Sequence, residues 1–301
     1  MAHNHNHTPS STTGRLIATI LLNFLTSLAE IIGGILSGSL SLISDALHNL
    51  SDGVSVIISL IALKLKKKDI SLKHTFGLKR AEILAAVFNA STLIAIYIFL
   101  FYEAVKRLYS PAVIEPEAMV IVAAAGLISN IAGTLLLKKD AEKSMNIRSS
   151  YIHLLSDSVA SVAVILGGLA IMWWNVYWLD PVLTILIGIY IVRESFVILM
   201  EAVHILMEGA PADISMEEIR REVEKFEEVA DIHHVHLWMV GENDVHLEAH
   251  INLADMSISQ SGIVRNKIEN MLNAKFGINH ITLQFECNEC GGAGLLGKDS
   301  H

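Results

Sequence analysis

The chain has 301 residues, of which 52% are hydrophobic and 18% charged, and its mean hydropathy is +0.49. A soluble domain carries about 25% charged residues, so this composition excludes an ordinary soluble protein and indicates membrane-spanning segments. The net charge of −9 arises beyond residue 208, because residues 1–208 hold 15 basic and 15 acidic side chains and residues 209–301 hold 7 and 16. An acidic tail repels nucleic acid and attracts cations, so we expect no nucleic-acid partner.

The first 14 residues are polar and include His3, His5 and His7. No basic stretch followed by a small-residue cleavage site marks them as a signal peptide. We expect residues 1–14 to form a disordered, histidine-containing tail with at most an accessory role in metal binding.

Six apolar segments follow this tail, and about 20 apolar residues are enough to cross the hydrocarbon core of a bilayer. The segments are residues 15–37, 40–64, 79–106, 115–138, 147–173 and 178–204. Lysine and arginine gather in the links after the second and fourth segments, which predicts that these links and both termini are cytoplasmic. We therefore expect residues 15–208 to form an all-α bundle of six transmembrane helices, surrounded by lipid in the cytoplasmic membrane.

Two of these segments contain a histidine followed four residues later by an aspartate. The pairs are His48 with Asp52 in the second segment and His153 with Asp157 in the fifth. Positions i and i+4 share one face of a helix, so each helix presents an imidazole beside a carboxylate. An ionisable group costs at least about 2.5–3.5 kcal/mol at mid-membrane. Two matched pairs therefore favour a metal or proton site over structural hydrogen bonding.

Two imidazoles and two carboxylates suit a tetrahedral divalent ion such as Zn²⁺. The spans contain no cysteine, so the thiolate ligands that Cu(I) prefers are absent from them. Asp45 precedes His48 by one turn, and we expect it to orient an imidazole from behind the ligands. Histidine and aspartate serve several metals, so the choice among Zn²⁺, Cd²⁺, Co²⁺ and Fe²⁺ stays open.

Beyond residue 208 the pattern changes to that of a soluble α+β domain. The expected elements are helix 215–228, strands 231–240 and 245–253, helix 259–276 and strand 280–286. In the second strand, apolar residues from Val245 to Ile251 alternate with polar ones, which predicts one buried and one wet face. Seven of the 14 histidines lie in this region, and Cys287 and Cys290 form a C-x-x-C that is a weak metal signal alone.

Three features of the sequence carry a specific resemblance. They are the paired His-x-x-x-Asp motifs, the stretch from His74 to Glu82 at the start of the third segment, and Leu179-Asp180-Pro181 at the sixth. Together they resemble the cation diffusion facilitator family, in its bacterial zinc/cadmium exporter branch, over nearly the whole chain. The resemblance implies a homodimer of six-span protomers that moves Zn²⁺, with Cd²⁺ and Co²⁺ as further candidates, out of the cytoplasm in exchange for protons. It also implies a ferredoxin-like, metallochaperone-like cytoplasmic domain over residues 209–286, followed by a cysteine-containing tail over 287–301.

The resemblance further implies roles for particular residues. The transport ligands would be His48, Asp52, His153 and Asp157. The cytoplasmic ligands would be His233, His250, His280 and Glu286, with Cys287 and Cys290 as an added metal clip. Zn²⁺ would then be both substrate and regulatory ligand. Arg80 and Glu208 match a charge pair that joins the membrane and soluble parts at the dimer centre.

Some relatives hold a further zinc ion in the link before the third segment. This chain keeps His74 there but has Ser71 and Leu78 at the other ligand positions, so we expect that site to be absent.

Two other classes of function stay open on the sequence. A membrane-embedded zinc hydrolase needs an open coordination position and a general base such as that of His-Glu-x-x-His, a motif that does not occur. A membrane-anchored metal sensor would use the bundle only as an anchor, which leaves the costly carboxylates of the second and fifth segments unexplained. We therefore expect a secondary transporter and not an enzyme.

Overall fold

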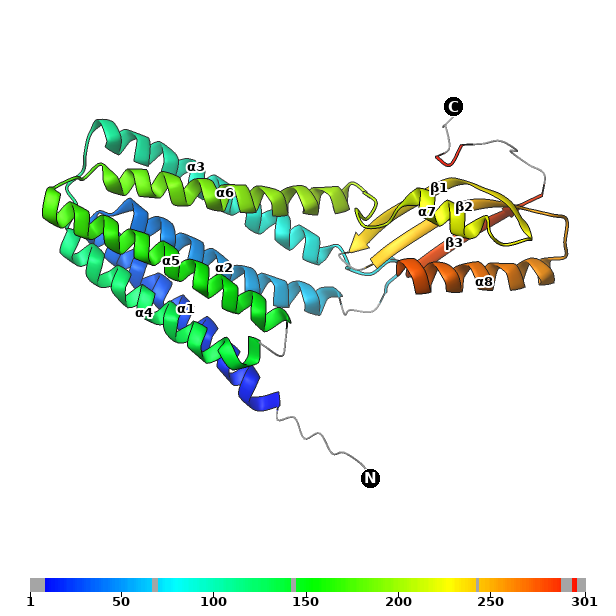
Figure 1. Ribbon diagram of the computed structural model, residues 1–301, viewed down its shortest axis with the longest axis horizontal. Helices are drawn as coiled ribbons and strands as arrows, with labels where there is room; N and C mark the ends of the chain where they lie inside the picture. Colours follow the sequence, from blue (N-terminus) through cyan, green and yellow to red (C-terminus); the bar gives the residue numbers. More distant parts are fainter. Residues whose placement is uncertain (1–8, 67–69, 142–144, 242–243, 288–293, 297–301) are drawn as a thin grey trace, which may run out of the picture. The chain divides into compact units, whose positions relative to one another are not determined.

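A computed structural model describes residues 9–66, 70–141, 145–241, 244–287 and 294–296 (Figure 1). The helices are α1 (Pro9–Ser37), α2 (Leu40–Lys66), α3 (Ala81–Tyr109), α4 (Pro116–Ala141), α5 (Met145–Trp174), α6 (Leu179–Leu206), α7 (Met216–Val223) and α8 (Ile258–Phe276). The strands are β1 (Val229–Gly241), β2 (Asp244–Leu253) and β3 (His280–Glu286). The chain divides into two compact units. The helical unit comprises Met1–Leu60 with Phe88–Ile198, and the sheet unit comprises Ile61–Val87 with Leu199–His301.

Helix α1 begins at Pro9, inside the tail that we expected to be disordered up to residue 14. The helical start has a physical reason, because the fixed φ of proline and its missing N–H suit the first position of a helix. The first eight residues of that tail, with all three of its histidines, lie outside the described residues.

Five of the described helices are long and apolar enough to cross a membrane. They are Thr19–Ser37 within α1, all of α3, Pro116–Lys138 within α4, Tyr151–Trp174 within α5, and all of α6. The expected second span is a continuous 27-residue helix, α2, but it is not among the five found in the described part of the chain. Its first half carries Asp45, His48 and Asp52, which lower its hydropathy. Six spans are therefore not confirmed.

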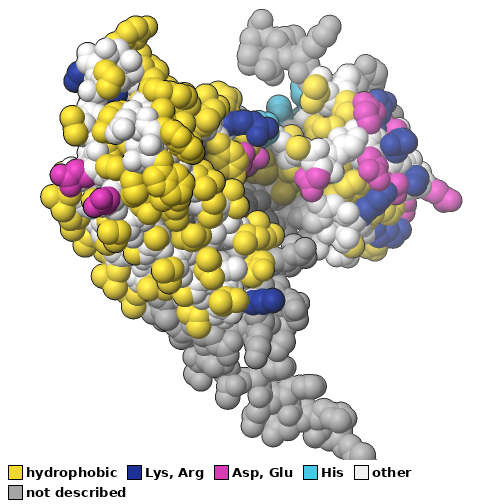
Figure 2. Space-filling view, turned by 60° about the vertical axis from the view of Figure 1, so that its left-hand side comes forward, with side chains coloured by type: hydrophobic (Ala, Val, Ile, Leu, Met, Phe, Trp, Pro, Cys, Tyr) yellow, Lys and Arg dark blue, Asp and Glu magenta, His cyan; other side chains and the backbone are white. Residues whose placement is uncertain are grey.

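The helices of the helical unit expose many large apolar side chains. Phe99 on α3 is 65% exposed and Leu166 on α5 is 60% exposed. Figure 2 shows hydrophobic side chains over most of the visible face of this unit, whereas acidic and basic side chains dot the sheet unit. So large an exposed apolar surface fits contact with lipid and not with water.

Helix α2 packs against two groups of helices in the helical unit. One apolar cluster joins it to α3 and α6, and its buried members are Leu40, Leu93, Tyr97, Leu100, Ala104 and Ile191. A second cluster joins it to α4 and α5, and its buried members are Leu42, Ile114, Met119, Ala123, Val164 and Ile171. Close packing on two sides fixes the rotation of α2 about its axis, and hence the direction of its polar side chains.

The start of α2 is fixed by a carboxylate from α6. Asp180 is fully buried and accepts hydrogen bonds from the backbone N–H groups of Leu40 (2.8 Å) and Ser41 (3.1 Å). Its carboxylate also accepts from the hydroxyls of Ser39 (2.7 Å) and Ser41 (2.6 Å). The first N–H groups of a helix have no partner within it, and the helix dipole favours an anion there. Asp180 therefore supplies the missing acceptor and ties α6 to the first turn of α2.

The sheet unit contains a three-stranded sheet in the order β1-β2-β3. β1 and β2 are antiparallel, whereas β2 and β3 are parallel and are joined through α8. Helices α7 and α8 and the sheet enclose one apolar core, which includes Ile219 of α7, Leu247 of β2 and Ile268 of α8. The expected order of helix, two strands, helix and strand is confirmed. The ferredoxin-like fold is not confirmed, because the described sheet has three strands.

Two details of this unit differ from expectation. Helix α7 ends at Val223 and not at residue 228, because two four-residue turns follow it: the N–H of Phe226 donates to the carbonyl of Val223, and that of Val229 to the carbonyl of Phe226. In β2 the alternating apolar residues are buried as predicted, but His246 and Asn252 on the other face are also only 3% and 4% exposed. That second face is therefore partly covered and not wholly wet.

We predict that Asp180→Ala lowers the free energy of unfolding by about 3 kcal/mol, because it leaves buried donors at the start of α2 without an acceptor. Asp180→Asn keeps one acceptor oxygen and should cost less. Thermal unfolding in detergent should show a midpoint lowered by about 6 °C or more for the alanine variant. The matched control is Glu117→Ala, an exposed acid in the first turn of α4. Equal midpoints for Asp180→Ala and the control would contradict the capping role.

Candidate metal centres

The helical unit brings together the two predicted His-x-x-x-Asp pairs. We call these four residues the bundle quartet: His48, Asp52, His153 and Asp157. The Nε2 atom of His153 lies 3.0 Å from Oδ2 of Asp52 and 3.6 Å from Oδ2 of Asp157. The Nε2 atom of His48 lies 3.5 Å from Oδ2 of Asp52 and 3.9 Å from Oδ1 of Asp157. Each imidazole therefore faces the carboxylate of its own helix and that of the other helix.

The side chains of the quartet differ in their exposure. The side chain of Asp157 is 3% exposed, whereas that of His153 is 41% exposed. Oδ2 of Asp52, Nε2 of His153 and Oδ2 of Asp157 are buried atoms without a well-aligned hydrogen bond among the described residues. Buried polar atoms normally have a partner. Nitrogen and carboxylate oxygen atoms that converge without one are the donor set that a divalent cation such as Zn²⁺ takes.

Asp45, which we expected to orient an imidazole, has another partner. Its carboxylate is 1% exposed and accepts a hydrogen bond from the hydroxyl of Ser161 on α5 (3.2 Å). The Nδ1 atom of His48 has no hydrogen-bond partner within the described chain. The structure therefore places Asp45 beside α5, near the quartet, and does not show it holding an imidazole.

The sheet unit holds a second group of histidines and a carboxylate. We call it the sheet cluster: His233, His234, His250 and Glu286. Nε2 of His233 lies 3.3 Å from Oε2 of Glu286, and Nδ1 of His250 lies 2.7 Å from Oε1 of the same residue. Ring nitrogens of His233, His234 and His250 lie within 4.8 Å of one another. Three imidazoles and a carboxylate again form a donor set for a divalent cation.

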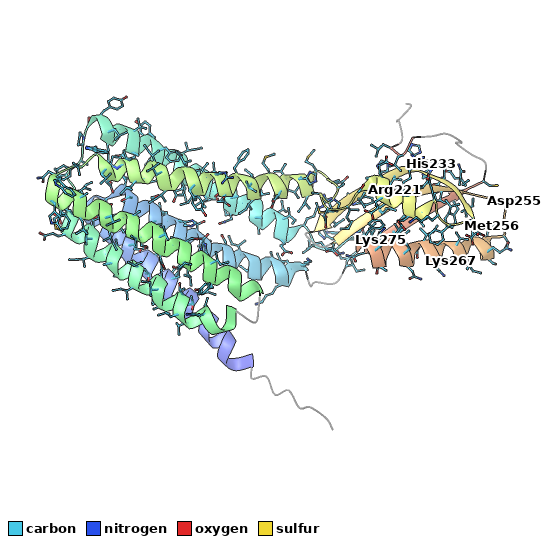
Figure 3. The ribbon with its side chains drawn as sticks, in the orientation of Figure 1. Arg221, His233, Asp255, Met256, Lys267 and Lys275 are labelled. Carbon is cyan, nitrogen blue, oxygen red and sulfur yellow. The ribbon has the colours of Figure 1, made fainter. Side chains whose placement is uncertain are left out.

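The local geometry of β1 explains this cluster. His233 and His250 are cross-strand partners, and the pairing of β1 with β2 is irregular between His233 and His236. His234 has φ +50°, in the left-handed region, so two successive histidines can serve one cluster where a regular strand would point them to opposite faces. Figure 3 labels His233 in the sheet unit. Oδ1 of Asp231 lies 2.7 Å from Nδ1 of His233 and holds this ring. Sequence alternation alone misses both His234 and Asp231.

The other residues predicted for this site lie elsewhere. His280 pairs with His246 in the β2–β3 register, with ring centroids 4.6 Å apart, and Phe76 packs against both rings. Six positions along β2 separate this pair from the end of the sheet that holds Glu286, a distance of about 20 Å. The structure therefore does not bring His280 into the cluster. Cys287 is described and exposed, and Cys290 lies outside the described residues.

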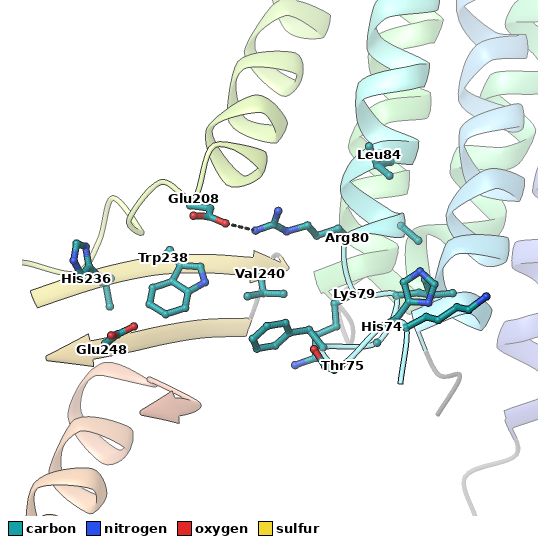
Figure 4. Close-up of a pocket in the computed structure, with 16 residues that line it drawn as sticks. His74, Thr75, Lys79, Arg80, Leu84, Glu208, His236, Trp238, Val240 and Glu248 are labelled. Atoms are coloured by element: carbon teal, nitrogen blue, oxygen red, sulfur yellow. Dashed lines mark hydrogen bonds and ion pairs between the residues drawn. The ribbon is translucent and has the colours of Figure 1, made fainter. Parts of the chain in front are cut away.

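Arg80 and Glu208, the charge pair implied by the resemblance, form an ion pair. Nη2 of Arg80 lies 3.2 Å from Oε1 of Glu208, within the sheet unit (Figure 4). The pair lines a cavity of about 870 Å³ between the α2–α3 link and strands β1 and β2. In the same unit Lys79 contacts Asp244 at 2.8 Å, so charges fix the link against the start of β2. His74 is exposed, and its backbone pairs with that of Ser71.

Comparison with known protein families assigns both parts of the chain. Residues 16–207 match the model of the cation efflux transmembrane domain. Residues 211–287 match that of the cation efflux protein, cytoplasmic domain. The chain therefore belongs to the cation efflux, or cation diffusion facilitator, family, and it is a membrane transporter of that class.

Individual relatives locate the chain within the family. It is 38% identical over 292 residues, 96% of this chain and 90% of the relative, to zinc transporter ZitB of Pectobacterium atrosepticum. It is 37% identical over 289 residues, 95% of this chain and 92% of the relative, to the cadmium, cobalt and zinc/H⁺-K⁺ antiporter of Bacillus velezensis. It is 34% identical over 288 residues, 96% of this chain and 90% of the relative, to metal cation efflux system protein CzcD of Cupriavidus metallidurans. These relatives confirm the predicted bacterial zinc/cadmium branch.

We predict that His246 makes the sheet unit sensitive to acid. Burial, followed by the nearby charges of His280 and Lys79, lowers the pKa of His246 below its usual value. The unfolded chain therefore binds a proton near pH 6.5 that the folded chain does not, so stability is retained above this pH and falls as the pH drops below it. Hydrogen–deuterium exchange of β2 and β3, compared at equal pH for wild type and His246→Gln, should show the loss in wild type alone. The same pH dependence in both proteins would contradict this account.

Proposed function

We propose that the protein exports divalent metal cations from the cytoplasm in exchange for protons, with Zn²⁺ as the main substrate and Cd²⁺ and Co²⁺ as further ones. The observation that carries the proposal is the bundle quartet, in which the Nε2 atom of each of two imidazoles lies within 4 Å of an oxygen of each of two carboxylates, from two separate helices. Ionisable groups inside a membrane-spanning bundle are costly, so their convergence requires a function that uses their charge. Relatives bearing the names of zinc transporters and of a cadmium, cobalt and zinc/H⁺-K⁺ antiporter support the same assignment.

The chemistry of the quartet supports exchange between metal and protons. Zn²⁺ takes four ligands in a tetrahedron, and imidazole must be neutral and carboxylate ionised to bind it. Metal and protons therefore compete for the same atoms. Metal that binds from the cytoplasm releases protons inward, and protons that enter from the outer side displace the metal outward. Rocking of helices around a fixed mid-membrane site provides access to each side in turn.

The proposed topology has six spans with both termini in the cytoplasm of a cell-membrane protein. Helix α2 is the sixth span in this account, because it packs inside the helical unit against helices that are apolar enough to cross a membrane. The domains are then a transmembrane region over residues 15–208 and a cytoplasmic metal-binding region over 209–286, with a cysteine-containing tail over 287–301. The basic links between spans support this orientation.

We further propose that the protein works as a homodimer. The side chains of Arg193 and Glu194, in the middle of α6, are exposed by 76% and 54%. Lipid is a costly surrounding for these charges, and a second protomer would cover them. The Arg80–Glu208 ion pair is the charge pair that the resemblance implies at the dimer centre.

The sheet cluster is the proposed regulatory site. The region beyond residue 208 carries 16 acidic and 7 basic side chains, so two such regions in a dimer repel each other. Zn²⁺ bound at His233, His234, His250 and Glu286 offsets part of that charge and draws the regions together, with Cys287 and Cys290 as the proposed added metal clip. Cytoplasmic metal would in this way set the transport rate.

The transport proposal predicts that Asp157→Ala lowers metal flux and mid-membrane metal binding by more than about 100-fold, since a ligand matters at least as much as the groups that support ligands. Flux of Zn²⁺ or Cd²⁺ into proteoliposomes measures the first effect, and isothermal titration measures the second. Glu117→Gln is the control for loss of a carboxylate elsewhere. Wild-type flux that does not respond to an imposed pH gradient would contradict proton exchange. A folded wild type that binds metal but moves none would instead favour a membrane-anchored sensor.

The regulatory proposal predicts that His250→Ala weakens metal binding at the sheet cluster by about 10–100-fold while the bundle quartet keeps its metal. Titration of the Asp157→Ala background isolates the cytoplasmic site for this measurement. His236→Ala, which removes an exposed histidine from the same sheet, is the matched control. Equal metal affinity in the His250 and His236 variants would show that the cluster is not the cytoplasmic site.

A further inference from the structure

A buried carboxyl group on α1 lies near the bundle quartet and has no part in it. Glu30 is 1% exposed, and its Oε1 atom has no hydrogen-bond partner among the residues described. Its Oε2 atom accepts a weak hydrogen bond from Nδ2 of Asn49 on α2 (3.4 Å). Asn49 directly follows His48 in the sequence, so this hydrogen bond links Glu30 to α2, the helix that supplies half of the quartet.

The space around Glu30 suits a proton and not a larger cation. A Cβ atom added at Gly126 of α4 would lie 1.9 Å from Oε1 of Glu30, so the carboxyl group rests directly against the backbone of that helix. A metal ion or potassium ion at Oε1 would need room for its radius and for further oxygen ligands. The backbone at Gly126 occupies the space beside Oε1 of Glu30, so a larger cation has no room on that side of the carboxyl group.

The charges around Glu30 also require a proton. Four buried or half-buried carboxyl groups lie in this region: Glu30, Asp45, Asp52 and Asp157. One divalent cation offsets two of their charges, and neutral imidazoles offset none. The ionisable groups that act on Glu30 are Asp45 of α2 and Asp157 of α5, both acidic, and α4 contributes only glycine at the point of contact. A buried carboxylate without a positive partner takes up a proton rather than remain charged.

We propose that Glu30 carries an exchangeable proton of the transport cycle, at a site separate from the metal ligands. This inference rests on the proposed exchange of metal for protons. Metal that enters the quartet cancels the charge of Asp157 and brings positive charge near Glu30, which then releases its proton to the cytoplasm. Metal that leaves restores the negative charge, and Glu30 takes a proton from the outer side. Each cycle thus exchanges the proton of Glu30, in addition to those of the ligands, for one metal ion.

The neighbouring amide suits both states of the carboxyl group. A side-chain amide offers N–H donors and a carbonyl acceptor. Nδ2 of Asn49 donates to the ionised carboxylate, as observed. Oδ1 of Asn49 has no partner in the described structure, and a rotated amide could accept from the protonated carboxyl. Asn49 therefore permits both states without a large rearrangement.

The test compares proton and metal fluxes in Glu30→Gln proteoliposomes. Zn²⁺ or Cd²⁺ influx is followed with a metal-sensitive dye, and proton efflux with a pH dye, on the same vesicles. The number of protons exchanged per metal ion should fall by about one in Glu30→Gln. Glu30→Asp keeps a carboxyl group and should keep the wild-type ratio. Glu117→Gln is the matched control, and metal binding in detergent should be retained in all three variants.

Several outcomes would overturn the proposal. An unchanged ratio in Glu30→Gln would show that Glu30 carries no exchanged proton. Loss of metal binding in that variant would make Glu30 a ligand, and loss of a potassium-dependent part of the flux would make it a potassium site. Absence of metal flux in wild type is a different failure, since it rejects the proposed function itself. Should Glu30→Gln not fold, infrared difference spectra of wild type and Glu30→Asp decide, because a carbonyl band of a protonated carboxyl should shift between them on metal binding.

Discussion

The structure depends on one electrostatic constraint: ionisable groups inside an apolar bundle must be neutralised by one another, by protons or by a cation. Two imidazoles and two carboxylates satisfy it by meeting at Nε2 and carboxylate oxygen atoms within 4 Å. Several of these oxygen and nitrogen atoms have no aligned hydrogen-bond partner among the described residues, which supports the proposal that a cation completes the arrangement. The same constraint applies to Glu30 and Asp45, which lie outside the quartet and have no basic neighbour among the groups that act on them.

The fold serves this constraint through α2. Asp180 of α6 fixes the first turn of α2, and Tyr97 of α3 donates its hydroxyl to the backbone carbonyl of Ser44 one turn later (2.9 Å). Apolar clusters on two sides of α2 then fix its rotation, with His48 and Asp52 facing His153 and Asp157 of α5. If α2 were rotated about its axis, His48 and Asp52 would lose their contacts with α5. The packing of α2 therefore determines the geometry of the quartet.

The sequence predicts, for a physical reason, that the two His-x-x-x-Asp pairs share one site, and the structure places their side chains together. Spacing of four residues places two polar groups on one helix face, and the cost of burying them in lipid makes a chance occurrence improbable. The order of helices and strands beyond residue 208 follows equally from periodicity. Those patterns report local geometry, and they are reliable where local geometry is regular.

The sequence fails where long-range packing or an irregular backbone decides. His234 joins the sheet cluster because of a left-handed residue in an irregular strand, which alternation cannot reveal. His280 was expected in that cluster but lies at the other end of the sheet, because β3 pairs with β2 in parallel from His246 onward. Glu30 is a lone acid in an apolar span. Its contacts with Asn49 and Gly126 join residues that are far apart in the sequence, so only the folded structure reveals them. A single charge carries no spacing from which a site could be inferred.

The central claim, that the bundle quartet binds one divalent cation, is tested most directly by X-ray absorption at the zinc edge. The full-length protein with His233→Ala and His250→Ala, which removes ligands from the sheet cluster, would be compared with the same protein carrying Asp157→Ala as well. The account predicts a bound zinc ion with about four nitrogen and oxygen ligands near 2.0–2.1 Å and no sulfur. It also predicts that this signal disappears with Asp157→Ala. A zinc signal unchanged by Asp157→Ala, or one with sulfur ligands, would contradict it.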